Sequence, residues 1–351
     1  MKNLKALTVL ILTILLFSFS CKEKKGTKKT ITTNNPKEFS DKAYVLNASY
    51  KVGDVRRYGI FPDSSFALKH PFTNKDKYET VFDIAENNDV KLFFPKGIYK
   101  TNLKIVGRDK LSIKFDNAEF TGIIQIIEKD TVSTSNINFS GNLTSYDGFF
   151  VRKSHQIQIE NLLLKSDVKK SLSGKRNKGC KIYAMTDKLT IKYLKIDDLG
   201  SGENYFKYNN SALAIEGWNS NPTNISIEEV YIKSSDRHGV YMTGTDNEIK
   251  KLTIEKFGVG LSNLLAPMED AAKGEEKEFT GLWMNKCDYC FVDNVTINEA
   301  GSKGVNTVFL DSGSPLKASE IGKLTILNDN TKIGIKKDPK TNIELVETII
   351  K

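Results

Sequence analysis

The sequence predicts an all-β protein in which a parallel β-helix forms most of the folded part. Three observations predict this fold: a repeated spacing of apolar residues, a short alternating strand ahead of each repeat, and an almost complete lack of helical periodicity in this region. In six segments of six residues, the first, fourth and sixth residues are apolar. The number of residues between one segment and the next varies, as expected for a coiled chain with loops of different length. They are Ile159-Leu162-Leu164, Ile191-Leu194-Ile196, Ile227-Val230-Ile232, Ile249-Leu252-Ile254, Val292-Val295-Ile297 and Ile321-Leu324-Ile326, with Phe115-Ala118-Phe120 as an earlier, weaker copy.

Each repeat is preceded by a short strand of the form apolar–x–apolar. The apolar pairs are Phe149/Val151, Ile182/Ala184, Leu213/Ile215, Val240/Met242, Leu282/Met284 and Val308/Leu310. With few helices to cover a sheet, neighbouring coils pair strand to strand and bury their inward residues in stacked layers. A β-sandwich is the alternative, but its hairpins need Asn-Gly or Asp-Gly turns at short intervals, and Asp147-Gly148 is the only such dipeptide in residues 46–351.

Composition sets the broad class. The chain has 351 residues, of which 39% are hydrophobic and 10% aromatic, so extensive disorder is excluded. Only one long apolar run exists, at the N-terminus, which excludes a polytopic membrane protein. Seven lysines and one glutamate in residues 1–30 account for most of the net charge of +9, so the remaining chain carries only +3. This balance gives no reason to expect a nucleic-acid partner.

The N-terminus predicts export. Two lysines in residues 1–5 precede an apolar stretch over residues 6–19, which is too short to span a bilayer and suits a signal peptide. The stretch ends at Ser18-Phe19-Ser20-Cys21 and resembles a bacterial lipoprotein signal. The resemblance implies a signal peptide over residues 1–20, a lipid on Cys21 and a polar tether over residues 21–45. The expected location is then the bacterial outer membrane or cell surface, or the periplasm; an ordinary cleaved signal with an incidental cysteine is the alternative.

The region before the repeats resembles a known superfamily. Val55-Arg56-Arg57-Tyr58-Gly59, then Asp63, a helix-like segment over residues 76–86 and the strand and turn KLFFPKGIYK (residues 91–100) follow one another. This order is similar to the N-terminal cap and first coil of the pectin-lyase-like superfamily. The resemblance implies a single-stranded right-handed parallel β-helix over residues 46–335 with an N-terminal capping helix, a C-terminal cap or tail over residues 336–351, and a monomer. It implies little about chemistry, because the superfamily holds lyases, hydrolases, epimerases and inert adhesins.

The outward residues of the first strands predict a carbohydrate groove. The residue between each apolar pair points outward. This gives a column of mostly aromatic residues: Phe150, Tyr183, Ala214, Tyr241, Trp283 and Phe309. The next outward column is Arg152, Met185, Glu216, Thr243, Asn285 and Asp311. Rings beside polar groups suit sugars. We therefore expect the substrate-binding residues to be Tyr183, Trp283, Trp218, Asn285, Asp311 and Arg152. The alternative is that the loops over residues 165–180, 197–211 and 255–280 cover the rings as a second small core.

The densest chemical segment is residues 235–241, Ser-Asp-Arg-His-Gly-Val-Tyr. His238 could act as acid or base near neutral pH, and Arg237 could bind a uronate carboxylate in bidentate fashion. Asp236 could orient His238, and Tyr241 could protonate a leaving oxygen. The alternative is a structural turn. His70 and His155 are expected to be structural or solvent-facing.

The phrase RHGVYMTG resembles the Gly-His-Gly strand of polygalacturonase-type hydrolases, but two further parts of that pattern are missing. The aspartate pair is replaced by Asn210-Ser211-Ala212-Leu213, and the Arg-x-Lys of the next coil by Leu282-Trp283-Met284. The polygalacturonase mechanism is therefore not carried over.

Three functions stay open for an exported protein with a polysaccharide partner. The favoured function is β-elimination in an acidic, uronate-containing polysaccharide, with Arg237, His238 and Tyr241 in the catalytic roles. The others are a glycoside hydrolase that uses Glu216 and Asp236, and a glycan-binding or adhesion protein without catalysis.

We expect no cofactor or metal, because no clear calcium loop is present and Cys287 and Cys290 lack a second ligand pair. An exported chain could join two of its cysteines in a disulfide, but buried small hydrophobic residues are the favoured interpretation for Cys180, Cys287 and Cys290.

Overall fold

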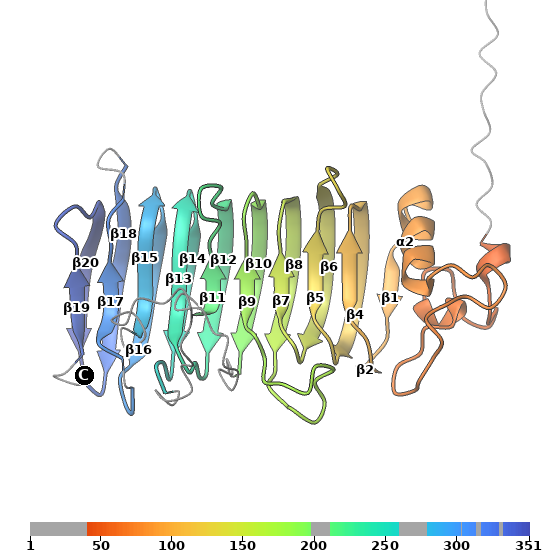
Figure 1. Ribbon diagram of the computed structural model, residues 1–351, viewed down its shortest axis with the longest axis horizontal. Coiled ribbons are helices and arrows are strands. Elements are labelled where there is room, and N and C mark those ends of the chain that lie inside the picture. The colour runs from red at the N-terminus through yellow and green to blue at the C-terminus, as the bar shows by residue number, and fades with distance from the viewer. Residues whose placement is uncertain (1–40, 198–210, 260–278, 303, 314–316, 330–332) are drawn as a thin grey trace, which may run out of the picture. The chain divides into compact units, whose positions relative to one another are not determined.

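The computed structural model describes residues 41–197, 211–259, 279–302, 304–313, 317–329 and 333–351. Its strands pair in parallel into two ladders, and the predicted parallel β-helix is confirmed (Figure 1). The first ladder holds β3 (Leu103–Val106), β5 (Ile124–Ile127), β7 (Phe149–Val151), β9 (Cys180–Ile182), β11 (Ser211–Ile215), β13 (His238–Thr245), β15 (Thr280–Asp288), β17 (Asn306–Leu310) and β19 (Gly334–Lys337). The second holds β4 (Asp109–Phe120), β6 (Thr134–Ser145), β8 (Ser154–Leu164), β10 (Asp187–Ile196), β12 (Thr223–Ile232), β14 (Glu248–Ile254), β16 (Phe291–Asn298), β18 (Ser319–Leu327) and β20 (Ile343–Ile350).

The apolar repeat forms three inward columns of the second ladder. Ile159, Ile191 and Ile227 are register partners from coil to coil, and the column continues through Ile249, Val292 and Ile321. All of these side chains are buried. Burial of each such side chain contributes about 1.5–3 kcal/mol relative to exposure, so a one-residue shift of any strand would be costly.

The register of one first strand differs from the prediction. Cys180 and Ile182, not Ile182 and Ala184, are the inward pair of β9, because Cys180 pairs with Phe149 on one side and Leu213 on the other. Cys180 is fully buried, as expected for a small hydrophobic residue, but it was not recognised as part of the repeat.

A helix closes the N-terminal end of the core, as predicted. α2 (Lys77–Asn88) begins after Asp76, whose side chain accepts hydrogen bonds from the backbone N–H groups of Tyr78 and Glu79. Its apolar face is buried, and β1 (Leu92–Phe94) and β2 (Gly97–Tyr99) follow and pair with β4. Arg108 fixes the polar face by binding Glu79, Asp83 (2.5 Å) and Glu86 (2.8 Å).

The folded unit begins at Asp41, before the predicted boundary at residue 46. The short 3-10 helix η1 (Lys42–Tyr44) follows, and the Asp41 carboxylate accepts hydrogen bonds from Arg57 Nε (2.6 Å) and from the Tyr58 hydroxyl (2.9 Å). The Arg57 guanidinium lowers the pKa of Asp41. Residues 55–58 form a second 3-10 helix, η2 (Val55–Tyr58). The predicted signal peptide, Cys21 and most of the tether lie outside the described residues.

The C-terminal segment does not form the separate cap or tail expected over residues 336–351. β19 pairs with β17, and β20 pairs with β18 in the same parallel register as the preceding coils. The apolar alternation of residues 343–350 is strand-like and continues the ladder, so the coil stack extends to Ile350.

We predict that Phe82→Ala in α2 lowers the free energy of unfolding by about 3–5 kcal/mol, because this fully buried ring joins the cap to the core. Denaturant unfolding followed by circular dichroism measures this change. Phe72→Ala is the matched control: its ring is 81% exposed, so we expect a change within about 0.5 kcal/mol. Equal effects of the two substitutions would contradict the role given to α2.

Candidate functional site

The register places the outward side chains of the first ladder in two columns. The first runs through Phe150, Lys181, Ala214, Tyr241, Trp283 and Phe309. Tyr183, predicted for this column, instead follows Ile182 and belongs to the second column, where Met185 was expected. The second column is therefore Arg152, Tyr183, Glu216, Thr243, Asn285 and Asp311.

The aromatic part of the first column is shorter and more enclosed than predicted. Trp283 lies between Tyr241 and Phe309, with ring centroids 4.9 Å and 5.4 Å away. The Lys336 ammonium lies 4.3 Å from the centroid of the Phe309 ring. These rings pack mainly on one another, so they offer little free ring face to a sugar.

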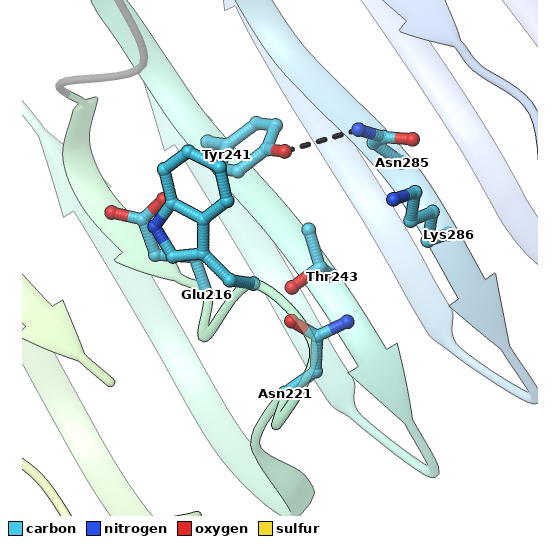
Figure 2. A pocket seen from close by; sticks show the side chains of 7 residues that line it. Glu216, Asn221, Tyr241, Thr243, Asn285 and Lys286 are labelled. Atoms are coloured by element: carbon cyan, nitrogen blue, oxygen red, sulfur yellow. Dashed lines mark hydrogen bonds between the residues drawn. The ribbon is translucent and has the colours of Figure 1, made fainter. Parts of the chain in front are cut away.

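A pocket of about 180 Å³ opens beside this aromatic group. Figure 2 shows side chains from consecutive coils around it: Glu216 after β11, Tyr241 and Thr243 on β13, and Asn285 and Lys286 on β15. Asn221 and Trp218, from the turn between β11 and β12, complete the lining. The pocket therefore joins a carboxylate, a phenol, two amides and an ammonium group.

Tyr241 holds its proton at neutral pH. Burial raises the pKa of its phenol to about 12, and the nearby Glu216 carboxylate acts in the same direction. Asn285 Nδ2 donates a hydrogen bond to the phenol oxygen over 3.0 Å, which partly offsets this rise. Tyr241 can thus donate a proton but cannot act as a base near pH 7.

Trp218 is the exposed aromatic residue of the pocket. Its side chain is 70% exposed, and its backbone lies in the left-handed region with φ 58°. This conformation is unusual for a bulky side chain. The turn is closed by a hydrogen bond from Ser220 N to Gly217 O of 3.0 Å. The turn thus holds an indole at the pocket margin, where a sugar ring could stack on it.

Residues 235–238 of the predicted catalytic segment lie at and just before the start of β13 and are buried. Arg237 and His238 are 2% and 1% exposed, and His238 Nδ1 accepts a hydrogen bond from Thr280 N (3.0 Å). The His238 ring also packs near Trp283, at 5.4 Å between centroids. Asp236 forms two hydrogen bonds with the Arg176 guanidinium, at 2.9 Å and 3.3 Å. Neither Arg237 nor His238 lines the pocket with Tyr241.

The hydrolase pair, Glu216 and Asp236, is not brought together. Ser211 is level with His238 in the ladder, and Glu216 lies five residues beyond Ser211. At the rise of a β-strand the backbone of Glu216 lies roughly 16 Å along the strands from the level of His238, and Asp236 precedes His238 by two residues. Glycosidases hold their carboxyl groups about 5–9.5 Å apart. The two residues are on adjacent coils, as expected, but at different positions along their strands.

The other predicted residues are located as follows. Arg152 forms an ion pair with Glu128 (2.8 Å), and Asp311 accepts a hydrogen bond from Trp283 Nε1 (2.9 Å). His70 is buried against the Tyr44 carbonyl at 3.1 Å, whereas His155 lies half-buried on β8. Two polar residues of the pocket, Asn221 and Lys286, are not among the predicted site residues. The Asn-Pro dipeptide at residues 221–222 is the one local signal, since it marks a turn.

No group of three or more His, Cys, Asp or Glu side chains suited to a metal occurs in the described part of the chain. Cys180, Cys287 and Cys290 are free and buried, and Cys287 Sγ and Cys290 Sγ donate hydrogen bonds to backbone carbonyls of β13 at 3.2 Å and 3.3 Å. Burial raises the pKa of the Cys180 and Cys287 thiols.

We predict that Cys180 and Cys287 do not react with a thiol reagent in the native Cys21→Ser chain, because a buried thiol with a raised pKa forms little thiolate. Labelling followed by peptide mass spectrometry measures this. Unfolding in guanidinium is the control and should expose both thiols. Rapid labelling of Cys180 in the folded chain would contradict the packing of β9.

No protein-family model, curated protein or solved structure matches this chain. Among the described residues, no helix has both the length and the apolar character needed to cross a membrane.

Proposed function

We propose that this chain binds an acidic polysaccharide in the pocket lined by Glu216, Trp218, Tyr241 and Asn285, and that it cleaves the polymer there by β-elimination. The observation that supports the proposal is the pocket itself, which combines an exposed indole with a carboxylate, a protonated phenol and an ammonium group. A sugar ring would stack on Trp218, and its hydroxyl groups would bind the amides of Asn221 and Asn285.

The groups of the pocket match the steps of an elimination. Lys286 and Asn285 would bind the uronate carboxylate, which makes the adjacent C5 proton more acidic. Glu216 would accept that proton as a double bond forms between C4 and C5 and the C4–O bond breaks. Tyr241 would donate its proton to the leaving oxygen. In this proposal Arg237 and His238, the residues expected from the sequence, support the end of β13 and do not touch the substrate.

A glycan-binding protein without catalysis is the second candidate. The burial of Glu216, which is 6% exposed, favours it, because a general base must reach the proton that it accepts. Hydrolysis is disfavoured by the distance between Glu216 and Asp236.

The location follows from the N-terminal signal. We propose that a lipid on Cys21 holds the chain at the outer membrane or the cell surface, with the polar residues after it as a tether. Palmitate labelling of the wild type and of Cys21→Ser tests this, and equal labelling of both would overturn it.

We predict that Tyr241→Phe lowers the rate of cleavage by about 10²–10⁴-fold while polysaccharide binding is retained, because the proton donor is lost and the ring is kept. Glu216→Gln should do the same. The measurement follows ultraviolet absorbance of the unsaturated product and new reducing ends in parallel, across a panel of acidic and neutral polysaccharides. Reducing ends without absorbance would contradict elimination, and neither signal with retained binding would support the second candidate.

We also predict that Trp218→Ala weakens polysaccharide binding about tenfold, since loss of a ring contact of roughly 1.4 kcal/mol has this effect. Affinity electrophoresis in polysaccharide-loaded gels measures the change. Met185→Ala is the matched control, because Met185 is also exposed on a turn but does not line the pocket. Unchanged retardation of Trp218→Ala would remove the indole from the site.

A further inference from the structure

One loop of the coil stack concentrates positive charge. It covers residues 165–178, between β8 and β9, and Figure 1 shows it projecting beyond β5 and β7. The loop holds six basic residues and one acidic residue, a net charge of +5, whereas the whole chain after residue 30 carries only +3. The rest of the chain after residue 30 is therefore slightly acidic, and the positive charge is local to this loop.

Buried polar groups hold the loop in place. The Asp147 carboxylate, which is 6% exposed, accepts hydrogen bonds from Ser173 N (3.1 Å) and Ser173 Oγ (2.7 Å). Asn177 is completely buried, and its Nδ2 donates hydrogen bonds to the carbonyls of Ser145 and Lys165, both at 3.1 Å. These bonds fix the backbone of the loop, so its outer side chains are presented from a defined support.

The loop exposes aliphatic side chains. Val168 and Leu172 are 49% and 52% exposed. The backbone of Leu172 is tied to the coil stack, because its N–H group donates a hydrogen bond to Thr121 O over 2.8 Å. No aromatic residue occurs in residues 165–178. The exposed apolar surface of the loop is thus entirely aliphatic.

Four exposed lysines lie close to these two side chains in the sequence: Lys169, Lys170, Lys175 and Lys178. The other basic side chains of the loop form ion pairs. Lys165 Nζ lies 3.0 Å from Glu119 Oε1, and Arg176 Nη1 lies 2.9 Å from Asp236 Oδ2. Asp167, the acidic residue of the loop, accepts hydrogen bonds from the backbone N–H groups of residues 169 and 170. The outer surface of the loop therefore combines ammonium groups with aliphatic side chains.

We propose that residues 165–178 dock on a lipid surface with anionic headgroups. The exposed lysines bind the headgroup phosphates, and Val168 and Leu172 enter the apolar boundary beneath them. An acidic polysaccharide would use the lysines alone, because sugar rings stack on aromatic residues and the loop has none. A lipid surface uses both kinds of side chain, which is why it is the favoured partner.

Docking through this loop leaves the pocket accessible. The strands of the first ladder are parallel, and the loop leads into the start of β9, whereas the turn that carries Trp218 follows the end of β11. The two features therefore lie at opposite ends of this ladder. Stable membrane attachment takes two signals, and the loop supplies a second signal beside the lipid proposed on Cys21. The docking itself depends neither on that lipid nor on the chemistry of the pocket.

The experiment measures the binding of residues 41–351 to vesicles by co-sedimentation. These residues form a compact unit with its own core, and they lack the apolar stretch and the basic tether, which would bind lipid themselves. We expect binding to vesicles that contain phosphatidylglycerol, little binding to pure phosphatidylcholine, and loss of binding at high salt. Lys169→Glu with Lys178→Glu should weaken binding at least about tenfold, since one lysine near an anionic surface contributes about fivefold.

Lys104→Glu with Lys114→Glu is the matched control for charge. Both lysines are exposed, on β3 and β4, and their replacement should leave at least half of the binding, because they lie outside the loop.

Val168→Ser with Leu172→Ser tests the aliphatic contact without a change of charge. It should weaken vesicle binding about fivefold or more. Val132→Ser is its control, because Val132 is 57% exposed in the turn between β5 and β6, at the other end of the first ladder. Circular dichroism checks that each variant is folded.

Three results would overturn the proposal. The first is a wild type that does not bind the anionic vesicles, and the second is unchanged binding by both loop variants. The third is a lysine variant that keeps its vesicle binding but loses retardation in polysaccharide-loaded gels, which would assign the loop to the polymer. The pocket is tested separately, because Glu216 and Tyr241 are unchanged in all of these variants.

Discussion

The structure depends on the stacking of identical inward positions from coil to coil. Successive coils of the second ladder from β8 to β14 add one apolar residue to each inner column, and the parallel ladder fixes that residue above its partner. Because the side chains of a strand alternate, the same register also fixes every outward position. A core constraint therefore determines which residues meet at the surface, although they come from segments far apart in the chain.

The pocket illustrates this dependence. Glu216, Tyr241 and Asn285 come from three successive coils and share no sequence motif. Their neighbours Ile215, Met242 and Met284 are register partners in the core. The loops between them differ in length without moving these positions, so the polar groups of the surface can change while the core stays the same. The buried Asp236 and Arg237 lie at the bend before β13, and His238 is the first residue of that strand.

The fold could be predicted from the sequence because the apolar spacing of the second ladder is regular, as in Ile191-Leu194-Ile196 and its copies. The strands of the first ladder are only three to nine residues long. In so short a strand a single residue decides which alternate side chains are taken to face the core. The sequence interpretation chose Ile182 and Ala184 over Cys180 and Ile182, which misplaced Tyr183 by one column. The candidate site was predicted only in part, since exposure of His238 and the distance between Glu216 and Asp236 depend on where a residue lies along its strand.

The position of α2 at the start of the folded unit bears on how the chain folds. Contacts of each coil are mainly with its two neighbours, so the molecule is close to a one-dimensional array. The cap and first coil are complete within the first eighty residues of this unit, and each later coil adds to an edge that is already formed. A chain that emerges with its N-terminus first can therefore grow by templated addition, without waiting for its C-terminal residues.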